Sequence, residues 1–272
     1  MTAPGTEPNT EDSSGESMTT ELFSLQGRNV LITGSSRGLG LALARGLAQA
    51  GAHIILNATN TSLLEERRGE FVAAGTPCAA YAFDITDPQA VEEAVEAIET
   101  EVGPIDGLVN NAGIQRRGAL EDIAEEDWQR LLDVNLTAAW RVAKTVARRM
   151  IERRQGKIVN IASLTSFGSR PSIGPYTAAK SGLAGLTRAM AVEWARHAMQ
   201  CNAIAPGYFA TDMTESLRDD PEFDAWVKLR TPAGRWGLPE ELTGAAVFLC
   251  SEASSFVNGQ ILYVDGGWTA NL

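Results

Sequence analysis

Tyr176 and Lys180 are the two residues whose types and spacing most directly indicate chemistry. A Gly-Pro turn signal precedes Tyr176, and the residues from there to Met190 are rich in Ala and Leu, which predicts a helix entered from a turn. At a spacing of four residues, the phenol and the ammonium share one helical face. A phenol with a pKa of about 10 is a poor base at neutral pH, but a neighbouring cation lowers that pKa. The pair is suited to moving a proton to or from an alcohol oxygen, although Tyr-x-x-x-Lys alone is more often an ordinary surface pair.

A glycine-rich stretch near the N-terminus has the pattern of a phosphate-binding loop. Residues 28–33 are β-prone, Gly34, Gly38 and Gly40 follow directly, and residues 41–50 have helical apolar spacing. In this context glycines permit a tight turn and close backbone approach, while the helix N-terminus offers free N–H groups to an anion. The spacing differs from the commoner G-x-G-x-x-G, and a purely structural turn is a rival interpretation of the loop taken alone.

The whole chain alternates between short apolar runs and helical patterns. This alternation predicts an α/β fold, a single-domain Rossmann-type doubly wound parallel sheet of about seven strands flanked by helices. No internal linker is visible, so we expect one domain over residues 23–272, with a less regular segment at 211–237. Strands are expected at 28–33, 53–57, 79–83, 105–109, 157–161, 200–204 and 260–264, and helices at 41–50, 61–74, 88–102, 124–154, 176–190 and 239–250.

Candidate binding residues follow the expected strands at their carboxyl ends. In a doubly wound sheet, ligands bind in the crevice beyond those ends. Tyr176 and Lys180 belong to the helix after the fifth strand, so they can face the same cleft. The strand-end residues are Gly34–Gly40, Asn57, Asp84, Asn111, Ser163 and Pro206.

Bulk composition argues against several classes of protein. The formal net charge of −11 argues against a nucleic-acid partner, and no apolar run approaches membrane-spanning length. Cys78, Cys201 and Cys250 lack metal-ligand spacing, and the last two lie in apolar segments, which predicts buried thiols in a reducing compartment and no metal site. Residues 1–22 form a polar, acidic segment, which predicts a disordered tail rather than a signal peptide, and a cytoplasmic protein.

Together these motifs resemble those of the short-chain dehydrogenase/reductase family, over about residues 25–267. The resemblance implies that Tyr176 is the acid/base and that Lys180 lowers its pKa and holds the nicotinamide ribose. Ser163 would hydrogen-bond the substrate oxygen, and Asn135 would position a water that links Lys180 to solvent. For Asn135 a bond within its own helix, and for Ser163 a strand end, are the alternative roles. The motifs are Thr33-Gly34-x-x-x-Gly38-x-Gly40, Asn110-Asn111-Ala112-Gly113, Asn135, Ser163, Tyr176-x-x-x-Lys180 and Pro206-Gly207.

The resemblance implies a nicotinamide dinucleotide cofactor. NAD-preferring members usually have an acidic residue after the second strand, but residues 56–60 contain none. Arg37 suits a 2′-phosphate, although Thr59 stands where many NADP-preferring members have a second basic residue, and a solvated charge is the alternative for Arg37. NADP is therefore the expected cofactor, with NAD use left open. The expected cofactor-binding residues are Gly34, Ser36, Arg37, Gly38, Leu39, Gly40, Asn57, Asp84, Ile85, Asn111, Ala112, Gly113, Tyr176, Lys180, Pro206, Gly207 and Thr211.

Further stretches resemble the gluconate 5-dehydrogenase branch of the family. The resemblance implies interconversion of D-gluconate and 5-dehydro-D-gluconate, with residues 211–237 as a mobile lid. Arg116 and Arg117 follow the fourth strand, where a guanidinium can clamp a carboxylate through two hydrogen bonds. The alternative is pairing of one or both arginines with surface acids such as Glu121 or Asp122. The stretches are residues 110–117, 205–213 and 223–237, and the expected substrate-binding residues are Ser163, Tyr176, Arg116 and Arg117.

Two other functions remain open. A 3-oxoacyl-[acyl-carrier-protein] reductase has nearly the same motifs, but it needs an exposed basic patch for its acidic partner. A non-catalytic dinucleotide-binding redox sensor would typically lack the Tyr or the Lys, and this chain has both. The resemblance also implies a homotetramer built from the helices after strands four and five and from the C-terminal strand. The arginines available for a basic patch are Arg116, Arg117, Arg148, Arg149, Arg153 and Arg154.

Overall fold

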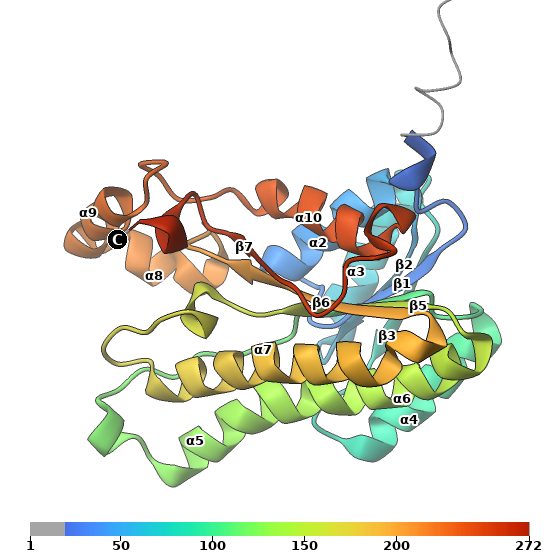
Figure 1. Cartoon of the computed structure of the whole chain (residues 1–272), viewed down its shortest axis with the longest axis horizontal. Helices are drawn as coiled ribbons and strands as arrows, with labels where there is room; N and C mark the ends of the chain where they lie inside the picture. The colour runs from blue at the N-terminus through green and yellow to red at the C-terminus, as the bar shows by residue number, and fades with distance from the viewer. Residues whose placement is uncertain (1–19, 272) are drawn as a thin grey trace, which may run out of the picture.

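The seven short apolar runs form one parallel sheet, as their alternation with helices predicted. The computed structural model describes residues 20–271. The strands are β1 (Asn29–Ile32), β2 (His53–Ala58), β3 (Cys78–Ala82), β4 (Gly107–Asn110), β5 (Gly156–Ile161), β6 (Met199–Pro206) and β7 (Ile261–Val264). They pair in the order β3-β2-β1-β4-β5-β6-β7, and every neighbouring pair is parallel (Figure 1). The strand order therefore reverses between β1 and β4, which is where a doubly wound sheet forms its crevice.

Helices cover both faces of the sheet. Helices α2, α3 and α10 contribute to the hydrophobic cluster on one face, and α4, α6 and α7 contribute to the cluster on the other (Figure 1). The helices are α2 (Gly38–Gln49), α3 (Thr61–Ala73), α4 (Pro88–Glu101), α5 (Glu125–Leu132), α6 (Ala138–Arg153), α7 (Gly174–Trp194), α8 (Glu215–Arg218), α9 (Pro221–Arg230) and α10 (Thr243–Cys250).

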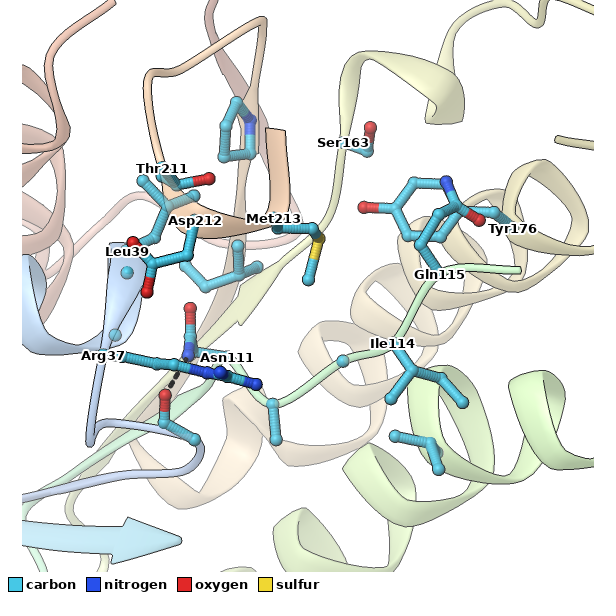
Figure 2. A pocket seen from close by; sticks show the side chains of 18 of the residues that line it. Arg37, Leu39, Asn111, Ile114, Gln115, Ser163, Tyr176, Thr211, Asp212 and Met213 are labelled. Atoms are coloured by element: carbon cyan, nitrogen blue, oxygen red, sulfur yellow. Dashed lines mark hydrogen bonds between the residues drawn. The ribbon is translucent and has the colours of Figure 1, made fainter. Parts of the chain in front are cut away.

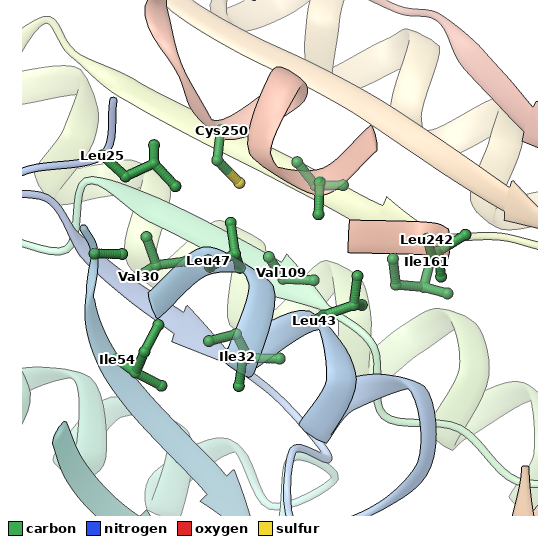
Figure 3. Close-up of a cluster of buried hydrophobic side chains, with 14 of the residues drawn as sticks. Leu25, Val30, Ile32, Leu43, Leu47, Ile54, Val109, Ile161, Leu242 and Cys250 are labelled. Atoms are coloured by element: carbon green, nitrogen blue, oxygen red, sulfur yellow. The ribbon is translucent and has the colours of Figure 1, made fainter. Parts of the chain in front are cut away.

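Because both faces are covered, successive strand residues are buried in different clusters. Val30 and Ile32 of β1 pack with Leu47 of α2 and Cys250 of α10, whereas Leu31 belongs to the cluster on the opposite face. Figure 3 shows the first of these clusters. Burial on both sides explains why the strands appear in the sequence as continuous apolar runs rather than as alternating ones.

Three segments differ from the expected elements. Residues 20–22 already have helical backbone, so the ordered structure begins before residue 23, and the rest of the expected tail lies outside the described residues. A π-helical turn (Asp133–Thr137) divides the expected helix at 124–154 into α5 and α6. The segment 211–237 contains α8 and α9. Helix α9 forms because Asp220 accepts hydrogen bonds from Glu222 N and Phe223 N while proline occupies its first turn.

The cysteines agree with their expected state. All three are free thiols, and Cys201 and Cys250 are buried. Within residues 20–271, no helix is long and apolar enough to cross a membrane. In the same range, no group of three or more His, Cys, Asp or Glu side chains could hold a metal ion.

A chain of buried side-chain hydrogen bonds ties α7 to the middle of the sheet. Asn110 Nδ2 donates to Asn160 Oδ1 at 3.0 Å, and Asn160 Nδ2 donates to Thr187 Oγ1 at 2.9 Å. Thr187 Oγ1 also donates to Leu183 O, one turn earlier, at 2.8 Å. Buried amides are costly unless they are hydrogen-bonded. The network therefore fixes the helix of the Tyr-x-x-x-Lys pair relative to β4 and β5.

We expect Thr187→Val to lower the free energy of unfolding by about 1–3 kcal/mol, because it leaves the Asn160 amide without its buried acceptor. Thr100→Val is the matched control, since Thr100 makes the same bond one turn back, to Glu96 O at 2.8 Å, on an exposed surface. Chemical denaturation followed by tryptophan fluorescence measures both variants. Equal losses of stability in the two would show that the buried network contributes nothing.

Candidate active site

A cleft with a volume of about 770 Å³ lies at the carboxyl ends of the strands. Its walls come from the glycine loop after β1, the ends of β2, β4, β5 and β6, and the first turns of α7, so segments distant in sequence meet there (Figure 2). All of the expected cofactor-binding and substrate-binding residues line it. Of the expected catalytic residues, Ser163, Tyr176 and Lys180 line the cleft and Asn135 does not.

Two glycines of the loop after β1 are required by geometry. Gly34 has a φ of +63°, and a Cβ there would lie 2.8 Å from the Ala112 Cα. A Cβ on Gly40 would lie 2.3 Å from the Gly34 O and 2.4 Å from the Asn111 Nδ2. No side chain caps the start of α2. Its first N–H groups therefore remain available to a phosphate, as the glycine pattern predicted.

Asn111 joins this loop to the end of β4. Its Nδ2 donates to Thr33 O at 2.9 Å and to Gly34 O at 3.0 Å. In return, Thr33 Oγ1 accepts hydrogen bonds from Asn111 N at 3.0 Å and from Ala112 N at 3.1 Å. These bonds close the gap between β1 and β4, the two strands at which the order reverses.

Asn57 lines the cleft, but its amide is taken up by the fold. The residue is only 1% exposed, and its Nδ2 donates to Tyr81 O at 3.2 Å and to Phe83 O at 3.0 Å. The expected cofactor contact is therefore not one that this side chain is free to make. Ala58 and Thr59 are the next residues that line the cleft, and a cofactor contact at this strand end stays a prediction.

Asp84 is oriented by a neighbouring turn. Its Oδ1 accepts hydrogen bonds from Thr86 N at 2.8 Å and from Thr86 Oγ1 at 2.7 Å. Burial acts to raise the pKa of Asp84, but these bonds and the nearby Arg130 and Arg141 hold it below its usual value. The carboxylate therefore stays charged at the rim of the cleft.

Tyr176, Lys180 and Ser163 meet on one side of the cleft. Figure 2 shows the hydroxyl groups of Ser163 and Tyr176 on the same side of the site. Lys180 is 4% exposed, and its Nζ donates to Ile161 O at 2.6 Å and lies 5.7 Å from the centroid of the Tyr176 ring. Ser163 Oγ accepts a hydrogen bond from Thr165 N at 3.1 Å, so Ser163 ends its strand segment and also faces the cleft.

Burial controls the protonation of this pair. It raises the pKa of Tyr176 to about 12, although a hydrogen bond with Ser163 acts in the opposite direction. Burial also lowers the pKa of Lys180 to about 8. Lys180 was expected to lower the pKa of the Tyr176 phenol. In the protein without ligands its ammonium points at Ile161 O, and the burial of Tyr176 has the larger effect on the phenol pKa. At neutral pH the pair is a neutral phenol beside an ammonium.

Asn135 supports the site from behind. It lies in the π-helical turn and is 1% exposed. Its Oδ1 accepts a hydrogen bond from Ile114 N at 2.8 Å, and its Nδ2 donates to Ile114 O at 2.9 Å. The side chain thus fastens the loop after β4 instead of bonding within its own helix. Its expected role in positioning a water stays a prediction.

The two arginines after β4 have different surroundings. Arg116 Nε pairs with Asp127 Oδ1 at 3.2 Å, and both side chains are about half exposed. The surface-pair alternative therefore holds for Arg116, with Asp127 in place of the acids expected from the sequence. Arg117 has no carboxylate within 4 Å among residues 20–271, and burial together with the nearby Arg170 lowers its pKa. Arg117 is the guanidinium that remains able to bind an anion.

Known proteins with similar sequences decide the family. Residues 34–269 match the family model described as enoyl-(acyl carrier protein) reductase. The chain is 54% identical over 252 residues to gluconate 5-dehydrogenase from Gluconobacter oxydans, which covers 93% of this chain and 98% of that protein. It is 50% identical over 247 residues to 5-keto-D-gluconate 5-reductase from Escherichia coli, covering 91% and 97% of the two chains.

The chain belongs to the short-chain dehydrogenase/reductase family. One solved member is a gluconate 5-dehydrogenase from Burkholderia cenocepacia in complex with NADP and tartrate. It is 48% identical to this chain, with a TM-score of 0.92 over 93% of this chain and 100% of that one. The resemblance of the motifs to this family, and the predicted sheet, are therefore confirmed.

Several residues of this short-chain dehydrogenase/reductase cleft were not predicted. Gln115, Asp212 and Met213 line it, and Figure 2 shows Met213 between Thr211 and Tyr176. All three lie within the stretches 110–117 and 205–213, so their closeness to motif residues in the sequence could have identified them as cleft residues. Arg130 enters from α5 without any local motif, and no sequence pattern pointed to it.

The pKa of Tyr176 predicts that alcohol oxidation and ketone reduction depend differently on pH. Alcohol oxidation needs the Tyr176 phenolate, so with a pKa of about 12 its kcat/KM should rise about tenfold per pH unit between about pH 6 and pH 8, the range in which Lys180 keeps its proton. Ketone reduction uses the neutral phenol and should not rise. Initial rates at saturating cofactor measure both profiles.

Tyr176→Phe is the control for this assignment. It should lower kcat by at least about 100-fold and abolish the pH slope of oxidation, while cofactor binding is retained. A wild-type oxidation rate that does not change with pH would contradict the proposed base.

Proposed function

We propose that this protein interconverts D-gluconate and 5-dehydro-D-gluconate, with NADP as its preferred cofactor. The relatives at 54% and 50% identity are named for these two directions of one reaction. The observation that carries the proposal to this chain is Arg117, which has no carboxylate partner among residues 20–271 and lines the same cleft as Tyr176, Lys180 and Ser163. The carboxylate of a sugar acid would supply the missing anion.

In this proposal the bound cofactor supplies or accepts the hydride. Tyr176 gives its proton to the substrate oxygen during reduction and takes it back during oxidation. The Ser163 hydroxyl donates to the same oxygen, and below the Lys180 pKa of about 8 its ammonium provides a positive charge close to the phenol ring. Such preorganised donors stabilise the oxygen as its charge develops. The high pKa of Tyr176 favours the protonated acid, which suits the reduction.

A 3-oxoacyl-[acyl-carrier-protein] reductase is less well supported, because two of the arginines of α6 pair with glutamates of α4. Arg153 Nη1 pairs with Glu99 Oε2 at 2.6 Å, and Arg148 lies 3.9 Å from Glu92. The chain as a whole carries a net charge of −11, which would repel an acidic carrier protein. A redox sensor is also less well supported, since both members of the Tyr-Lys pair line the cleft.

We further propose a single catalytic domain over residues 23–272, a homotetramer in the cytoplasm, and a lid at residues 211–237. Large apolar side chains on α6, α7 and β7 support the tetramer. Trp140, Val192 and Leu262 are 42%, 81% and 37% exposed, and contact between copies would remove them from water. Sedimentation at micromolar concentrations tests the assembly.

Arg37 is the residue expected to select NADP. It is exposed at the start of α2, lines the cleft, and has no carboxylate within 4 Å among the residues the structure describes. Arg37→Ala should raise the KM for NADP by at least about tenfold and change the KM for NAD little, because only NADP has the 2′-phosphate. Steady-state kinetics with each cofactor measures this. A wild-type preference for NAD would contradict the cofactor proposal.

A substrate panel tests the reaction itself. The panel contains D-gluconate, the neutral D-glucitol and acetoacetyl thioester, each with the matching redox form of NADP. We expect the kcat/KM for D-gluconate to be at least about tenfold above that for D-glucitol, because only the acid can bind Arg117. NMR of the product should place the new carbonyl at C5. Turnover of the thioester alone would overturn the proposal.

A further inference from the structure

Two guanidinium groups from different loops lie near each other beside the cleft, and of the two only Arg117 is among the residues that line it. Arg117 follows β4, and Arg170 lies in the loop that leads into α7. A hydrogen bond from Gly118 N to Ser172 O, at 3.1 Å, joins the two loops. In the part of the chain that the structure describes, neither arginine has an acidic side chain within 4 Å. Their mutual repulsion helps to lower the pKa of Arg117.

Arg170 is held in place but is not satisfied. Its Nη1 donates to Pro171 O at 3.2 Å and reaches Ser172 Oγ at 3.5 Å, whereas its Nε is buried and has no hydrogen-bond partner. A buried guanidinium donor without an acceptor is costly. Among the described residues the two arginines therefore carry an uncompensated positive charge, which an anion with two oxygens would neutralise.

Arg170 also contacts the segment proposed as a lid. Its Cζ lies 5.1 Å from the centroid of the Phe223 ring on α9. It also lies near Tyr208, which follows Gly207 at the end of β6: burial raises the pKa of Tyr208, and the charge of Arg170 acts in the opposite direction. The Tyr208 ring in turn packs against four aromatic rings at centroid distances of 5.0–5.9 Å. These four rings belong to Phe223, Trp226, Trp236 and Trp268.

We propose that Arg170 is a specificity-determining residue that binds the substrate carboxylate together with Arg117. The ligand class is an open-chain sugar acid, with one carboxylate oxygen for each guanidinium. Because Arg170 rests on the Phe223 ring, an occupied clamp also restrains α9. The identity of the acid rests on the proposed function, whereas the presence of an anion site does not.

The first test compares an acid with its neutral analogue. We expect Arg170→Gln to lower kcat/KM for D-gluconate roughly 10- to 100-fold, mainly through KM, and to leave kcat/KM for D-glucitol within about twofold. Arg170→Lys keeps the charge but not the planar fork, and should fall between the wild type and Arg170→Gln. An equal loss for both substrates, or none, would overturn the clamp. If Arg170→Gln fails to fold, the ratio of kcat/KM for D-gluconate to that for D-glucitol in Arg170→Lys tests the clamp instead.

Arg68→Gln is the control for the loss of one surface charge. Arg68 is exposed on α3 and pairs with Glu65 at 2.7 Å. This variant should behave as the wild type with both substrates. Thermal melting and NADP titration of each variant separate a local effect from misfolding.

The second test does not depend on turnover. Tartrate, a small dicarboxylate, is titrated into the NADP-loaded protein by calorimetry, with the tryptophan fluorescence of the lid recorded in parallel. Arg170→Gln should weaken tartrate binding roughly 10- to 100-fold. Equal affinity in the variant, or no binding to the wild type, would overturn the clamp. If no sugar acid is turned over but Arg170→Gln still loses tartrate affinity, the proposed substrate fails and the clamp stands.

Discussion

The site depends on the hydrogen bonds by which Asn111 holds the end of β4 against the glycine loop after β1. Pairing of β1 with β4 ends at the bond from Thr33 N to Val109 O, and beyond it the chain leads into helices on opposite faces, so the Asn111 bonds extend the contact into the loops. The same bonds leave no space for a side chain on Gly40, and they set where α2 begins. The contact between Asn111 and the glycine loop thus positions the open N–H groups of α2. It also positions the loop after β4, which Asn135 fastens and which leads to the two arginines.

Desolvation has opposite effects on the two members of the catalytic pair. It raises the pKa of Tyr176 to about 12 and lowers the pKa of Lys180 to about 8, so burial moves the two pKa values apart and favours the neutral form of each group. The buried network of Asn110, Asn160 and Thr187 keeps α7 fixed while this balance operates. The asparagine–threonine network thus fixes the helix, whereas Tyr176 and Lys180 carry the protons.

The fold and the position of the cleft could be predicted from the sequence because they follow from local patterns. Doubly buried strands appear as apolar runs, and glycine spacing directly reports backbone geometry. The partners of polar side chains could not be predicted in this way. Asn57 and Asn135 bond backbone groups of distant segments, and Arg116 pairs with Asp127 on α5. Arg170 has no motif around it, so only the folded chain brings it beside Arg117.

The interior position of Asn57 limits how the cofactor preference of this enzyme can be redesigned. A common strategy would place an acidic residue at the end of β2 to favour NAD. At position 57, however, a carboxylate would face the carbonyl oxygens of Tyr81 and Phe83, which now accept from the amide. Repulsion between these oxygens would destabilise the sheet, whatever its effect on the choice between NAD and NADP. Protein engineers should therefore introduce the charge at Ala58 or Thr59, which line the cleft.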